Sequence, residues 1–159
     1  MSRTFAFAIA LIGSSILVPT AQAQATADQL DQIAKLSADA YDKQPEVFAE
    51  AKAWLKDDAK HAFANKKLDR AEGKKLVDDL YAAGAVRVYA GGLVPDGEKQ
   101  NAGVLSVIVG GKPEVRAKVY SLINDFMKKQ LAAQGKADLL GSLVQPDAGS
   151  PIVLVPLEF

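Results

Sequence analysis

The sequence predicts an α+β protein in which N-terminal helices are followed by a ββαβ unit with a small, mixed, three-stranded sheet. Two observations carry this prediction. Apolar residues recur every three to four positions in several long stretches, which is the period of one helix face. In other stretches this period is lost, and short runs rich in β-branched residues appear, as is typical of strands. The stretches follow the order helix, helix, helix, strand, strand, helix, strand.

Three helices are expected before the first strand, over residues 26–41, 45–63 and 70–83. The second carries the widest apolar stripe, and Pro45 suits its first helical position, where no backbone donor is needed. Asp69 and Glu72 have the spacing of a capping box at the start of the third helix, and Gly84 suits its C-terminal end.

Two strands are expected after Gly84, over residues 86–90 and 104–109, as an antiparallel hairpin with glycine turns between them. A long helix follows from Pro113 to Gly135, and residues 152–155 form the last strand. A helical crossover normally makes the strands that it joins parallel, hence the mixed sheet. The second half resembles a fragment of the ferredoxin-like split βαβ arrangement over roughly the last 90 residues. This resemblance concerns architecture and carries no functional motif.

The first 23 residues are predicted to be a signal peptide. Arg3 precedes an uncharged run over residues 5–18, and Pro19 follows it. Ala21 and Ala23 are the small residues that a signal peptidase reads, so cleavage is expected after Ala23. The run is shorter than the roughly 20 residues of a membrane span, so no stable membrane anchor is expected after cleavage. The protein is therefore expected to be periplasmic or secreted in a bacterium, with an uncleaved anchor as the alternative.

Residues 24–159 are expected to form a single α+β domain, with residues 24–65 as a helical arm and residues 66–159 as an αββαβ core. Of the 159 residues, 49% are hydrophobic, and 19 Lys and Arg balance 19 Asp and Glu. This composition disfavours a disordered chain, and the absence of excess positive charge disfavours a nucleic-acid partner. The chain has no cysteine, which excludes disulfides, thiol catalysis and thiolate metal sites.

The hairpin offers the main candidate binding surface. If one face of its strands packs on helices, then Arg87, Tyr89 and Ser106 share the other face. Either the N-terminal helices cover this second face with Trp54 and the phenylalanines of their stripe, or it stays open as a binding surface. Arg87 and Tyr89 together could hold a carboxylate or an aromatic group. These three residues are the predicted ligand-binding or partner-binding residues.

A metal site is a weaker alternative. On a helix, Asp57 and Asp58 would lie close to His61, the only histidine, and could supply part of a metal site. A solvated ion pair explains the same spacing, because a complete site needs ligands from elsewhere. No other motif indicates a cofactor.

The turn Gly110-Gly111-Lys112 before Pro113 could present backbone donors to an anion, although it lacks the full phosphate-loop pattern. A tight turn before a helix explains it equally well.

These observations favour a small exported binding or interaction protein without catalytic activity, whose partner is an unknown protein or small molecule. The serines stand in no nucleophile motif, and a single histidine leaves few catalytic arrangements. One alternative is an extracytoplasmic hydrolase, which would need two carboxylates facing each other across a cleft. Another is a self-associating structural or assembly protein, in which residues 152–157 pair as a sheet edge.

Overall fold

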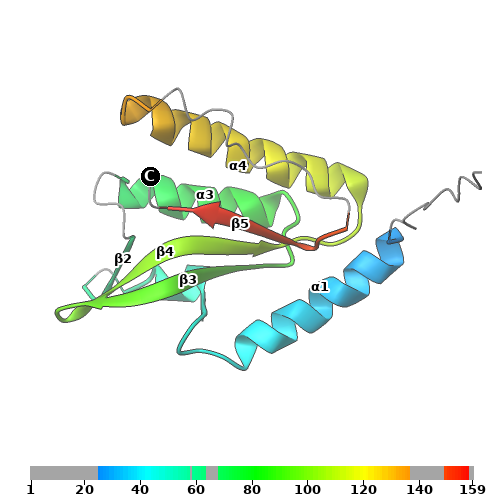
Figure 1. Cartoon of the computed structure of the whole chain (residues 1–159), viewed down its shortest axis with the longest axis horizontal. Coiled ribbons are helices and arrows are strands. Elements are labelled where there is room, and N and C mark those ends of the chain that lie inside the picture. Colours follow the sequence, from blue (N-terminus) through cyan, green and yellow to red (C-terminus); the bar gives the residue numbers. More distant parts are fainter. Residues whose placement is uncertain (1–24, 58, 64–67, 137–148, 158–159) are drawn as a thin grey trace, which may run out of the picture.

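A computed structural model describes residues 25–57, 59–63, 68–136 and 149–157. It confirms an α+β fold and arranges it in three layers, with one helix on one face of a sheet and the other helices on the opposite face (Figure 1). The elements are α1 (Ala27–Asp42), β1 (Ala49–Glu50), α2 (Ala51–Trp54), β2 (His61–Phe63), α3 (Arg70–Ala82), β3 (Arg87–Asp96), β4 (Lys99–Ile108), α4 (Pro113–Ala133) and β5 (Ile152–Pro156). The predicted signal peptide, residues 1–23, lies outside the described residues.

The sheet has five strands rather than three, and the β3–β4 hairpin forms its centre. Both strands are longer than predicted, because they continue through Gly91 and Gly92 to a tight turn at Gly97, which has φ +64°. Glycine adopts this left-handed conformation at little cost. β1 pairs antiparallel with β3, while β2 and β5 lie along the other side of β4. The sheet is mixed only because the short strand β2 runs parallel to β4.

The last strand runs opposite to the predicted direction. β5 pairs antiparallel with β4, with Ser106 opposite Leu154. The reason is the position at which the described chain resumes after α4: Arg116, in the first turn of α4, donates from Nη2 to Ser150 O at 2.9 Å. The chain therefore enters β5 at the same end of the molecule at which it left β4. A split βαβ unit needs parallel strands, so the ferredoxin-like detail is not confirmed.

The predicted helix over residues 45–63 is wrong. Of the described residues of this segment, only the four of α2 are helical, with β1 before them and β2 after them. The apolar residues of this segment belong to two different cores: Phe48 packs on the α1 side of the sheet, whereas Trp54 and Phe63 pack on the opposite side. One straight helix cannot reach both faces of a sheet, so tertiary packing overrides the helical period.

The other helices are confirmed with their caps. Thr26 and Gln29 form a complete capping box at the start of α1. Asp69 accepts from Ala71 N at 2.8 Å at the start of α3, and Gly84 has φ +104° just beyond its end. Glu72 does not complete the predicted box; its side chain bonds to Lys129 and Gln130 of α4 instead.

Two apolar clusters hold the layers together. The larger lies between the sheet and α2, α3 and α4, and its fully buried members include Leu80, Leu105 and Ile123. The smaller lies under α1, where Ala34 and Ala38 face Tyr89 and Ile108. None of the helices in the described part of the chain combines the length and hydropathy that a membrane span requires.

Candidate functional site

Two surface depressions lie along the groove between α3 and α4. These helices are antiparallel, because Glu72 at the start of α3 bonds to Lys129 near the end of α4, while Gly84 beyond α3 packs on Val115 at the start of α4. In Figure 1 the two helices lie one above the other on the side of the sheet opposite α1.

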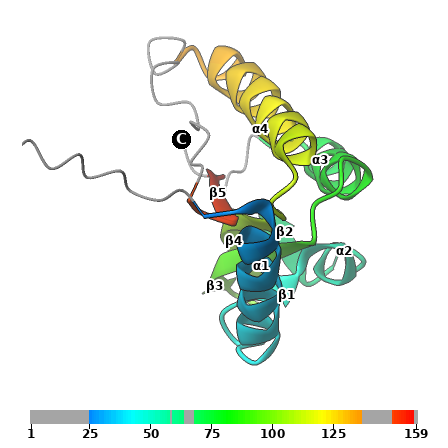
Figure 2. The same cartoon turned by 90° about the vertical axis from the view of Figure 1, so that its right-hand side faces the viewer.

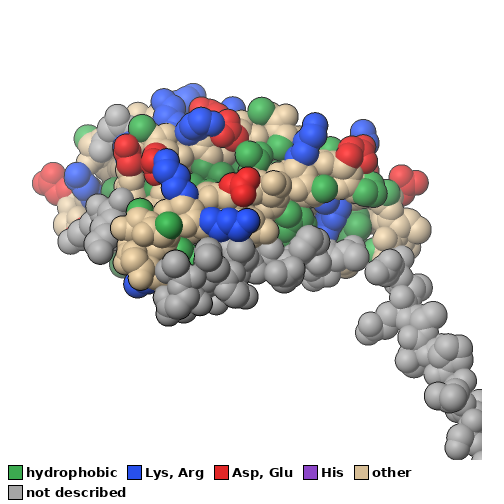
Figure 3. All heavy atoms as spheres, turned by 90° about the horizontal axis from the view of Figure 1, so that it is seen from above, with side chains coloured by type: hydrophobic (Ala, Val, Ile, Leu, Met, Phe, Trp, Pro, Cys, Tyr) green, Lys and Arg blue, Asp and Glu red, His purple; other side chains and the backbone are tan. Residues whose placement is uncertain are grey.

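The groove contains two adjoining depressions, of about 240 and 490 Å³, which are open to solvent and share Asp79 and Leu122. Half-buried and buried apolar side chains, Leu76, Leu122 and Phe126, line the smaller one. Figure 3, which views the molecule from the α4 side, shows hydrophobic side chains between acidic and basic ones on this surface. The groove therefore offers an apolar floor with charged walls.

The charges on the two halves of the groove differ. In the smaller depression, Lys75 pairs with Asp79, and Lys129 pairs with Glu72 across the two helices. Hydrogen bonds from Lys129 and Gln130 hold the pKa of Glu72 below its usual value. In the larger depression, Lys118 has no ion-pair partner among the described residues, and it lies in the same lining as Ser121. The end of the groove near Lys118 is thus the end suited to a negative group.

Helix α1 covers the predicted binding face of the hairpin. Tyr89 is 1% exposed, and its hydroxyl donates to Asp42 Oδ1 at 2.8 Å and contacts Ala38 O at 3.1 Å. Ser106 is equally buried, and its hydroxyl has no hydrogen-bond partner in the described structure. Trp54, expected to help cover this face, lies in the opposite core. A ligand could reach Tyr89 and Ser106 only if α1 moved.

Arg87 is the exposed member of the predicted trio. It lies at the start of β3, and its Nη1 donates to Val86 O at 3.1 Å. The structure therefore separates Arg87, at the surface, from Tyr89 and Ser106, beneath α1. Their role as ligand-binding or partner-binding residues stays a prediction.

The predicted metal pair does not lie on a helix. His61 is the first residue of β2, its ring stacks on Trp54 at 4.9 Å, and its Nδ1 lies 2.7 Å from Trp54 O. Asp57 instead accepts from Lys60 N at 3.2 Å in the preceding turn. Asp58 lies outside the described residues. Among the residues that the structure does describe, no three His, Asp or Glu side chains are placed to share a metal ion.

The glycine turn between β4 and α4 does receive an anionic group, and this group comes from the chain itself. Gly111 N donates to Asp31 Oδ1 at 2.8 Å, which fixes α1 to the turn. A Cβ at Gly111 would lie 2.1 Å from Ala27 O, so only glycine allows this approach. Asp31 therefore occupies the donor that an external anion would need.

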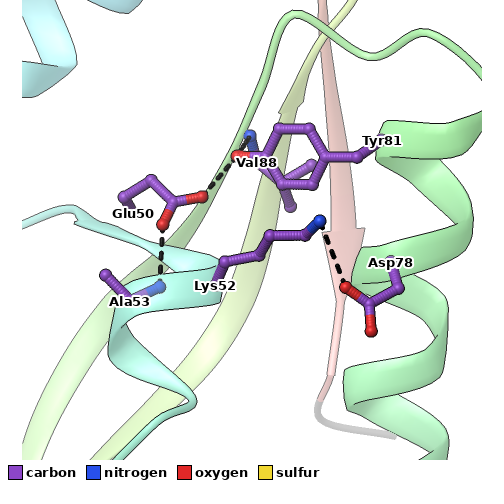
Figure 4. A network of polar contacts seen from close by, with 6 residues as sticks. All are labelled: Glu50, Lys52, Ala53, Asp78, Tyr81 and Val88. Carbon is purple, nitrogen blue, oxygen red and sulfur yellow. Dashed lines mark hydrogen bonds and ion pairs between the residues drawn. The ribbon is translucent and has the colours of Figure 1, made fainter.

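A polar cluster that the sequence did not predict joins β1, α2 and α3 (Figure 4). Tyr81 donates to Glu50 and accepts from Val88 N at 3.1 Å, while Glu50 accepts from Ala53 N at 2.7 Å. Burial, followed by the bond to Glu50, raises the pKa of Tyr81 to about 12. Lys52 lies over the Tyr81 ring and pairs with Asp78 at 3.2 Å. Because Tyr81 takes up an outward N–H of β3, this cluster closes part of the sheet edge.

The sequence does not predict the groove, because helical periodicity alone places Leu122 and Phe126 on the same apolar face of α4 as its core residues. A signal was present in the width of that face: the apolar stripe of α4 also contains Val119, Ile123 and Met127, which are buried, whereas Leu122 and Phe126 are only half-buried. A stripe wider than one packing face leaves its margin at the surface. Comparison with protein-family models, with curated proteins and with solved structures finds no match to this chain.

Proposed function

We propose that the chain is an exported binding protein without catalytic activity, whose ligand lies along the α3–α4 groove. The observation that carries the proposal is an apolar floor, Leu76, Leu122 and Phe126, with Lys118 at one end, a lysine that has no ion-pair partner within the described ranges. This pattern fits a molecule or protein segment with an elongated apolar body and one acidic group. Few, well-placed polar groups in a mostly apolar depression are typical of ligand sites.

The acids of the groove give less support to the hydrolase alternative. Glu72 and Asp79 lie on the same helix, about 10 Å apart along its axis at 1.5 Å per residue, which exceeds the usual carboxylate separations of glycosidases. Each is paired with a lysine. The pKa of Glu72 is lowered, whereas a general acid needs a raised one. The properties of Glu72 and Asp79 thus favour a role in the walls around a ligand over a role as an acid/base pair.

The proposal is tested with 8-anilinonaphthalene-1-sulfonate, a probe with an apolar aromatic body and one negative group. We expect its fluorescence to rise on binding, and the amide NMR signals of Leu76, Leu122 and Phe126 to shift. Leu122→Glu places a charge on the floor, so the affinity should fall at least tenfold. Lys118→Gln should weaken binding about threefold, since the lysine is exposed to solvent.

The matched control is Ala117→Glu, which adds the same charge to an exposed position on the flank of α4 that faces away from α3. It should leave the affinity unchanged, and thermal unfolding should show that all three variants fold. Equal affinities of Leu122→Glu and Ala117→Glu, or shifts confined to other surfaces, would refute the groove as the site.

A further inference from the structure

β5 forms one edge of the sheet, on the side away from α2 (Figure 2). The hydrogen bonds at its two ends fix which of its backbone groups point outward. Val109 N donates to Pro151 O at 2.7 Å, and Leu157 N donates to Gly103 O at 2.9 Å. Because bonded residues alternate along an antiparallel strand, Val153 and Val155 bond to β4. The backbone groups of the remaining residues, Ile152, Leu154 and Pro156, therefore point away from the sheet.

The outward backbone groups of these three residues differ in their hydrogen bonding. The hydroxyl of Ser150 donates to Ile152 O at 3.0 Å and accepts from Ile152 N at 3.2 Å. Pro156 has a carbonyl to offer but no N–H. The outward N–H and C=O of Leu154 have no partner in the described part of the chain, and its side chain is 57% exposed. As far as the chain is described, a donor and an acceptor without partners thus lie at the middle of the edge, beside an exposed apolar side chain.

We propose that this edge binds a second copy of the chain, with the two β5 strands antiparallel about a two-fold axis at Leu154. In this register the two copies of Leu154 exchange both of their backbone hydrogen bonds, and Ile152 lies opposite Pro156. Ile152 N–H, which donates to the Ser150 hydroxyl in the single chain, donates to the Pro156 carbonyl of the second copy instead. Pro156 has no N–H to donate to Ile152 O in return, but that oxygen already accepts from the Ser150 hydroxyl. Every outward group of the edge is then paired.

The side chains fit the same pairing. Residues opposite each other on adjacent strands share a face, so Leu154 lies on the α1 side of the sheet, next to Ser106. The two Leu154 side chains meet across the axis. Residues 149–157 carry no charge, so the strand lacks the lysines that commonly prevent edge pairing. Three residues per copy make a small interface, and the dimer is therefore expected to depend on concentration.

The absence of cysteine from the chain allows a direct test of this register. Directly paired residues that exchange hydrogen bonds have Cα atoms about 5.5 Å apart, which is the usual spacing of a disulfide. Leu154→Cys should therefore form a disulfide-linked dimer under mild oxidation. Val94→Cys, equally exposed at 59% but on β3, is the matched control and should remain monomeric at the same concentration.

Sedimentation velocity on the unmodified mature chain completes the test. We expect a monomer–dimer equilibrium that Leu154→Lys shifts to monomer by at least tenfold in the dissociation constant, while Val94→Lys leaves it unchanged. Circular dichroism checks that both lysine variants fold. A monomer at all concentrations, a dimer that Leu154→Lys does not weaken, or crosslinking of Leu154→Cys no faster than that of Val94→Cys, overturns the proposal.

Discussion

Two tyrosines show how single residues connect the layers of this fold. Tyr89 reaches from β3 to the end of α1, and Tyr81 reaches from α3 to β1 and β3. Burial raises the pKa of both phenols, and in each case a carboxylate, Asp42 or Glu50, adds to the effect. A phenolate at either position would be desolvated and would lie beside a negative charge.

This environment predicts a loss of stability at alkaline pH. The pKa of Tyr81 is about 12 in the folded chain against 10.0 for the ordinary phenol. Between these values the folded state holds a proton that the unfolded state releases, so the free energy of unfolding falls as the pH rises from 10 to 12. Tyr81→Phe should be less stable at neutral pH, by about 1–2 kcal/mol, because Glu50 and Val88 lose a partner.

Chemical denaturation of both proteins at several pH values gives the measurement. Over the alkaline range the variant should lose less stability than the unmodified chain, because one of the shifted phenols is gone. If the two stability curves run parallel, Tyr81 does not titrate as described.

At the scale of elements, the parts that the sequence predicted are those whose signals are local. Helices α1, α3 and α4 depend on nearby residues: Thr26 and Asp69 cap the first two, and Pro113 stands at the start of the third. The helix predicted over residues 45–63 is wrong because the apolar residues of this segment are divided between two faces of the sheet. Only the tertiary structure reveals this division. The predicted direction of β5 is wrong for a similar reason: it depends on long-range contacts, such as the bond between Arg116 and Ser150.

The docking of α1 on the sheet is expected to depend on Gly111. In Gly111→Ala the new methyl group would overlap Ala27 O, and the bond from Gly111 N to Asp31 would be displaced. Overpacking of this kind typically costs about 1–3 kcal/mol. We expect faster hydrogen exchange throughout α1, while α3 and α4 remain protected.

Gly97→Ala is the control for this prediction. Gly97 has φ +64° but nothing near its Cβ position, so alanine there should cost about 1 kcal/mol through backbone strain alone, without a local effect on α1. Uniform exchange in Gly111→Ala would mean that the glycine does not fix α1.

For the molecule as a whole, the sequence predicts that helices lie on both faces of the sheet, but it does not predict the α3–α4 groove. Four helices are too many for one face of a small sheet, which favoured a helix on each side, and α1 does cover the second face. The α3–α4 groove, by contrast, depends on how far Leu122 and Phe126 lie from the centre of a packing face. That quantity follows from the angle between the two helices, and the width of the apolar stripe on α4 indicates only that its margin lies at the surface.

The proposed export of the chain makes one further prediction. Signal peptidase requires small residues at the positions now held by Ala21 and Ala23, so the mature protein should begin at Gln24. We expect the fold to tolerate this cut, because the capping box of Thr26 and Gln29, with bonds of 2.8 and 3.3 Å, lies beyond it and starts α1.

Expression of the full chain in a bacterium, with mass spectrometry and N-terminal sequencing of the periplasmic fraction, provides the measurement. Ala23→Leu should block cleavage and leave the precursor at the membrane, because the larger side chain does not fit the peptidase. Ala25→Leu, two residues beyond the cut, should be processed normally. A purified protein that retains Met1 in the unmodified chain would contradict export, whereas cleavage lost only in Ala25→Leu would move the mature start to Thr26 and leave the capping box intact.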